Sequence, residues 1–92
     1  MRIIGYIEHP GMKITVFKTD TRISVKFETG FYEQTYKFPI DVHLQNLDDV
    51  KKLVDQAFIS AVRQEMERMH RISVQAAARR PPEKEHDFEE II

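Results

Sequence analysis

The first forty residues alternate apolar and polar positions with a period of two, and short turn signals interrupt them. We expect the turns at Pro10-Gly11, Asp20-Thr21 and Thr29-Gly30, between four runs rich in β-branched and aromatic residues. Alternation of this kind is typical of strands that bury one face. Residues 2–38 therefore predict a four-stranded antiparallel meander.

Tight turns fix the register of the hairpins, and the register decides which side chains share a face. Two-residue turns give three pairings of apolar residues: Ile7 with Ile14, Val16 with Val25, and Phe27 with Tyr32. The predicted core face then carries nine apolar residues and the polar Gln34; the nine are Ile7, Ile14, Val16, Ile23, Val25, Phe27, Tyr32, Tyr36 and Phe38.

The opposite face of the predicted sheet is mostly polar, but it carries an apolar cluster with cations beside it. We take six of its residues as a candidate binding face: Ile4, Tyr6, Phe17, Arg22, Lys26 and Lys37. Aromatic rings between cations are typical of surfaces that stack the bases of single-stranded nucleic acid. Exposed apolar patches also mark protein interfaces. The residues alone leave both interpretations open.

From residue 47 the apolar positions change to the spacing of three and four that is typical of an amphipathic helix. Asn46 is the expected N-cap, and Asp48 and Asp49 follow in the first turn, where the helix dipole favours anions. No Gly or Pro occurs between Pro39 and Pro81. We therefore expect an α+β fold over residues 1–80, with the four-stranded antiparallel β-meander packed on one long C-terminal amphipathic helix that is weakest at 72–74.

The predicted helix is longer than the sheet. At about 1.5 Å per residue it spans roughly 50 Å, whereas strands of about eight residues span roughly 27 Å. A second copy of the chain is the simplest cover, because a symmetric dimer presents the same patch twice. The candidate dimer seam has a spacing of four and three: Val62, Met66, Met69 and Ser73. We expect a homodimer; the alternative is ordinary core that ends early.

Charge and composition indicate which classes of protein this chain does not belong to. Residues 1–80 hold 13 Lys and Arg against 10 Asp and Glu, a charge of +3, whereas residues 81–92 hold 1 against 5, a charge of −4. We expect 81–92 to be an acidic, disordered tail. The lack of cysteine excludes disulfides and thiolate metal sites. With no long apolar run and no signal-peptide pattern, we expect a cytoplasmic protein without membrane contact.

The sequence lacks motifs that carry chemistry. Its three glycines form no phosphate-binding loop, and no serine stands in a nucleophile elbow. Glu67 and His70 have the i, i+3 spacing of di-iron bundles but lack the further carboxylates, so we expect no metal site and no cofactor. We therefore expect a non-catalytic interaction or regulatory module. The alternatives are a single-stranded DNA- or RNA-binding protein and a small-molecule sensor with a pocket between helix and sheet.

The order of elements resembles a known group of proteins. Four antiparallel strands over 2–38, followed by a helical stripe from Leu47 to Met69, look like the Whirly and Pur families and the related single-strand-binding coactivators. The resemblance covers residues 2–70 as architecture. It implies dimerisation through the helix and binding of single-stranded nucleic acid on the sheet. Those families present more cationic sheet faces, so the resemblance assigns no individual binding residue here.

Overall fold

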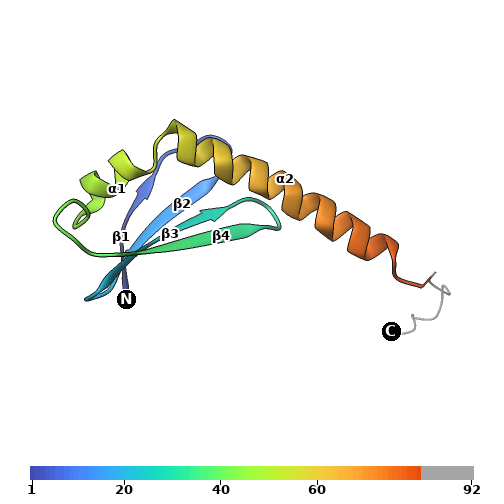
Figure 1. Ribbon diagram of the computed structural model, residues 1–92, viewed down its shortest axis with the longest axis horizontal. Coiled ribbons are helices and arrows are strands. Elements are labelled where there is room, and N and C mark those ends of the chain that lie inside the picture. The colour runs from blue at the N-terminus through green and yellow to red at the C-terminus, as the bar shows by residue number, and fades with distance from the viewer. Residues whose placement is uncertain (82–92) are drawn as a thin grey trace.

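The structure of the chain, a computed structural model, describes residues 1–81 as one sheet followed by two helices (Figure 1). The antiparallel sheet has the order β1-β2-β3-β4. The elements are β1 (Arg2–Ile7), β2 (Lys13–Lys18), β3 (Arg22–Glu28), β4 (Glu33–Pro39), α1 (Leu47–Leu53) and α2 (Gln56–Ala78). The α+β class and the antiparallel meander are confirmed. From residue 82 onward, the predicted acidic tail lies outside the described residues.

The first two hairpins have the predicted register. Ile7 pairs with Ile14, and Val16 pairs with Val25. The second turn is closed by a hydrogen bond of 2.9 Å from the Thr19 N–H to the carbonyl of Arg22, while the Thr19 hydroxyl accepts from the Arg22 N–H at 3.1 Å. A threonine that bonds its own turn in this way fixes the loop length and hence the register.

The register of the third hairpin differs from the prediction by two residues. Phe27 pairs with Gln34 and not with Tyr32, because the two-residue turn is Gly30-Phe31, one position later than predicted, and is closed by a 2.9 Å bond from the Thr29 N–H to the carbonyl of Tyr32. A shift of two leaves every side chain on its predicted face. The predicted core face is therefore correct, although the predicted pairs in this hairpin were wrong.

The predicted single helix is divided at Val54 and Asp55. Asn46 caps α1 as expected, since its side chain accepts from the Asp49 N–H at 2.9 Å. Asp55 caps α2 in the same way, accepting from the Phe58 N–H at 2.9 Å. The second helix therefore has its own N-terminal cap, and it runs through 72–74 without a break.

The core lies between the helices and the inner face of the sheet. Five side chains of β2 and β3 are at most 1% exposed: Ile14, Val16, Ile23, Val25 and Phe27. Phe58 of α2 stacks on three rings of the sheet: Phe27, Tyr36 and Phe38. The polar Gln34 donates from Nε2 to the carbonyl of Val62 at 3.0 Å and accepts from the hydroxyl of Tyr36. Its burial against the helix is therefore compensated by hydrogen bonds.

The second helix crosses the inner face of the sheet and continues past its end (Figure 1). Contacts of Gln34 with Val62, and of Tyr32 with His70, mark its path along β4. Beyond His70, every residue to Arg80 is exposed. None of the helices within residues 1–81 combines the length and the hydropathy needed to cross a membrane.

Candidate interaction surfaces

A β-bulge in β1 changes the back face, which is the side of the sheet away from the helices. Ile3 pairs with Phe17 and Gly5 pairs with Val16, so Ile4 is the extra residue. Ile4 is half-buried and packs against the core, while Ile3 is 50% exposed. The prediction that Ile4 lies beside Phe17 on the back face was wrong, because the bulge advances the alternation by one residue. Ile3 takes its place.

The remaining aromatic residues of the candidate binding face lie on the back face. Tyr6 is 53% exposed, and the Nζ of Lys13 lies 5.8 Å from the centroid of its ring, within cation–π distance. Phe17 is half-buried. Between these rings and Lys26, the side chain of Thr15 is only 4% exposed. The back face thus carries an apolar strip with Tyr6 as its most exposed ring.

Not all cations of this face are available to a ligand. Lys26 lies 3.7 Å from Glu28 and 3.8 Å from Glu33, and its side chain is 29% exposed. Arg22 and Lys37 are exposed and form no ion pair within residues 1–81. Exposed ion pairs add little stability, but they cancel charge. Two of the three predicted cations therefore remain to attract an anionic partner.

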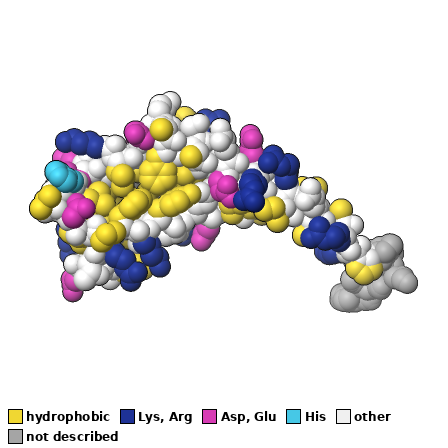
Figure 2. Space-filling model, in the orientation of Figure 1, with side chains coloured by type: hydrophobic (Ala, Val, Ile, Leu, Met, Phe, Trp, Pro, Cys, Tyr) yellow, Lys and Arg dark blue, Asp and Glu magenta, His cyan; other side chains and the backbone are white. Residues whose placement is uncertain are grey.

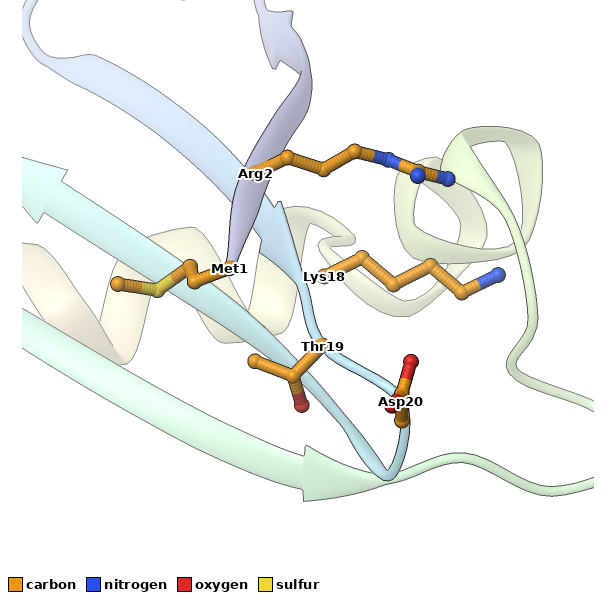
Figure 3. Close-up of a pocket in the computed structure, with 5 residues that line it drawn as sticks. All are labelled: Met1, Arg2, Lys18, Thr19 and Asp20. Atoms are coloured by element: carbon orange, nitrogen blue, oxygen red, sulfur yellow. The ribbon is translucent and has the colours of Figure 1, made fainter.

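The bulge also places Arg2 and Lys18 opposite each other on the helix side of the sheet. Together with Met1, Thr19 and Asp20 they line an open depression of about 520 Å³. Figure 3 shows Arg2 and Lys18 extending in the same direction, toward the side of α1. The Nζ of Lys18 donates to the carbonyl of Gln45 at 2.7 Å, and Asp20 adds a negative charge. Among the lining residues, Arg2 is then the cation that remains to bind an anion. One cation beside an aspartate is not enough for an anion site.

A second open depression, of about 490 Å³, lies between the first hairpin tip and α2. Met12 and Met66 form its apolar part, and Arg63 and Glu67 form its polar part. His9 at its rim accepts at Nδ1 from the Gly11 N–H at 3.0 Å, so its role is in the turn. The methionines belong to the core, and their exposure of 8% each leaves little apolar surface for a small molecule.

The predicted dimer seam is only partly accessible. Val62 is 1% exposed and Met66 is 8% exposed, because their own sheet covers them. Met69 also packs against this core, whereas Ser73 is exposed. The assignment of Val62 and Met66 to a seam was therefore wrong, since neither can reach a second copy in the folded chain.

The accessible apolar surface lies further along the helix. We call residues 71–80 the projecting segment; it contains three arginines and no acidic residue. Its Ile72 and Val74 are 53% and 51% exposed. Phe31, in the turn between β3 and β4, is 95% exposed. Figure 2 shows hydrophobic and cationic side chains side by side along the projecting helix. Phe31 was not among the predicted site residues. An aromatic residue directly after the turn signal Thr29-Gly30 could have indicated it.

His70, which the sequence pairs with Glu67, contacts the turn between β3 and β4. The Nδ1 of His70 lies 3.1 Å from the hydroxyl of Tyr32, and the two rings meet edge to face with centroids 6.0 Å apart. In the part of the chain that the structure describes, no group of three or more His, Asp or Glu side chains could hold a metal ion. His70 instead fastens α2 to the last turn of the sheet.

Comparisons with known proteins give no relative. No family model, no curated protein and no solved structure matches the chain. The class of the protein is therefore defined by its own architecture, a four-stranded antiparallel sheet followed by helices. Likeness to the Whirly and Pur families stays a prediction.

Proposed function

We propose that this chain is a non-catalytic interaction module that acts as a homodimer. The observation that supports it most is the projecting segment together with Phe31. Both present large apolar side chains to solvent at the end of the sheet where α2 leaves it. Large apolar side chains exposed to solvent in this way mark protein interfaces.

The length of α2 supports the same proposal. Helices gain most of their stability from packing an amphipathic face, and a stretch without such packing is marginal in water. Residues 71–78 are helical although all of them are exposed. Ile72 and Val74 point to different sides of the helix, and a second copy packed on either side would supply the missing packing. In a symmetric dimer the same contact covers the exposed helix of both copies.

Three single substitutions test the dimer. We expect Ile72→Glu and Val74→Glu each to weaken it about tenfold or more, because a charge replaces a buried apolar group. Gln64→Glu is the matched control, since Gln64 is an exposed residue of α2 outside the projecting segment. Size-exclusion chromatography with light scattering gives the mass. If Ile72→Glu and Val74→Glu keep the mass of the unmodified chain, the projecting segment is not part of an interface.

A second function is favoured by the back face. Tyr6 presents an exposed ring with Lys13 beside it, and Arg22 and Lys37 are exposed on the same face. Such a surface suits single-stranded nucleic acid, in which each base stacked on an aromatic ring contributes about 1–3 kcal/mol. Against it stand Glu28 and Glu33, which hold Lys26 and lower the positive potential.

Fluorescence polarisation with a labelled oligothymidine at about 50 mM salt tests this second function. If the back face binds, Tyr6→Ala weakens binding about tenfold, and Lys37→Gln weakens it more than Lys52→Gln on α1 does. The affinity also falls as salt is raised. A flat polarisation signal for the unmodified chain eliminates the nucleic-acid function and leaves the interaction module.

A further inference from the structure

The outer edge of β4 is an open pairing site. Only β3 pairs with β4, and no other backbone partner of Glu33–Pro39 occurs within the described residues. The strand is regular over seven residues and contains no bulge. The opposite edge differs, because β1 carries the bulge at Ile4 that blunts pairing. Pro39 has no N–H and limits pairing at the end of β4, so the stretch from Glu33 to Phe38 is the template for another strand.

The charges on this edge are unbalanced within one chain. Glu33 pairs directly with Glu28 across the sheet, and both form an ion pair with Lys26. The side chain of Glu33 remains 60% exposed. Lys37 is exposed and stands opposite the neutral Ser24. Within residues 1–81, β4 therefore carries an acidic residue that shares its cation, Glu33, and a cation without an ion pair, Lys37. The two are four residues apart.

We infer that two copies join edge to edge through β4, antiparallel, with Thr35 on the two-fold axis. This arrangement rests on the proposed homodimer and adds the edge of β4 to its interface. In this register Glu33 stands opposite the partner's Lys37, and Lys37 opposite the partner's Glu33. A direct cross-strand pair of opposite charges is favourable, and symmetry supplies it twice.

Alternation of the side chains restricts the choice of register. Side chains of paired residues lie on the same face, so the axis must pass through a residue position, and the neighbouring choices are Gln34 and Tyr36. With Gln34 on the axis, Glu33 faces the partner's Thr35. With Tyr36 on the axis, Glu33 faces the partner's Pro39. Only Thr35 on the axis forms both charge pairs.

The core is open along this edge. Tyr36 and Phe38 of β4 are half-buried, although Val25 and Ile23, their partners in β3, are fully buried. Figure 2 shows hydrophobic side chains gathered between the helices and the sheet. A two-fold axis perpendicular to the sheet keeps both α2 helices on one side of it. The second copy therefore extends the sheet and covers the open side of the core.

Two complementary variants test this interface. Glu33→Lys and Lys37→Glu each turn both cross-strand pairs into like-charge pairs, so each variant alone should dimerise about tenfold more weakly than the unmodified chain. An equimolar mixture restores opposite charges in both pairs of a heterodimer. We expect the mixture to recover the dimer mass in sedimentation velocity. Circular dichroism of each variant checks that both remain folded.

The matched control is Lys13→Glu, which reverses a charge on the same face at the inner strand β2, where Glu28 of β3 is its cross-strand partner. It should leave the dimer mass unchanged. If the unmodified chain dimerises and the mixture does not recover the dimer, the edge interface is wrong and the homodimer stands. If the unmodified chain is a monomer at every concentration, the homodimer and the edge interface fail together.

Discussion

Gly5 is the residue at which β1 and α1 approach most closely. A Cβ built on Gly5 would lie 2.5 Å from the Cδ2 of Leu47, which is closer than real Cβ atoms come to any neighbour. The leucine would have to move from its packing against the core. A glycine therefore sets the distance between the first helix and the edge of the sheet.

We expect Gly5→Ala to lower the free energy of unfolding by about 1–3 kcal/mol, because the added methyl group overpacks this contact. Gly30→Ala is the control, since a Cβ there meets nothing within 4 Å. Urea denaturation compares the two variants at equal protein concentration. Equal midpoints for both would show that Leu47 yields without cost.

The sequence pattern did not predict the face of one residue of the candidate binding face, Ile4. Ile3 and Ile4 are both apolar, so the run through Gly5 and Tyr6 fits a regular strand as well as a bulged one. The exposed Tyr6 was placed correctly, because the hairpin turn fixes its pairing with Thr15. The bulge shifts the register further along β1, between Ile3 and Gly5, where the turn no longer fixes it. The face of Ile4 could therefore not be predicted.

At the scale of elements, the division between α1 and α2 depends on Asp55. Its carboxylate accepts the Phe58 N–H at 2.9 Å, one of the N–H groups at a helix start that have no partner within the helix. The apolar stripe runs across the division, with Leu53 and Val54 on one side and Phe58 on the other. The stripe alone therefore predicts one helix, and the capping aspartate is the local signal that it missed.

We expect Asp55→Ala to destabilise the chain by about 1 kcal/mol, since it removes the cap of the longer helix. Asp48→Ala is the comparison, because Asp48 lies in the first turn of α1 and its side chain makes no capping bond. Thermal unfolding followed by circular dichroism measures both. Equal losses would mean that Asp55 acts through its charge and not through its hydrogen bond.

Turn chemistry explains which pairs of strands were predictable. The first two hairpins follow from loops whose lengths the local residues fix, such as the turn closed by Thr19. In the third, Thr29-Gly30 suggests the two-residue turn, but the turn residues are Gly30 and Phe31, one position later. Phe31 is a strand-forming residue, so composition could not place it in the turn.

At the scale of the whole molecule, the mismatch between helix and sheet was predictable from element lengths alone. Which residues it leaves uncovered was not predictable, because this depends on where α2 begins over the sheet. The sheet covers the stripe as far as Met69, and the contact of Tyr32 with His70 ends the covered part. The interface that we propose therefore lies at the projecting segment, Phe31 and the edge of β4, and not at Val62 and Met66.

If a second copy covers what one chain leaves exposed, the protein is a dimer in solution. Sedimentation equilibrium of the unmodified chain over the micromolar range measures this. We expect a species of twice the 10.9 kDa chain mass that dissociates on dilution. A single species of 10.9 kDa at every concentration would contradict it.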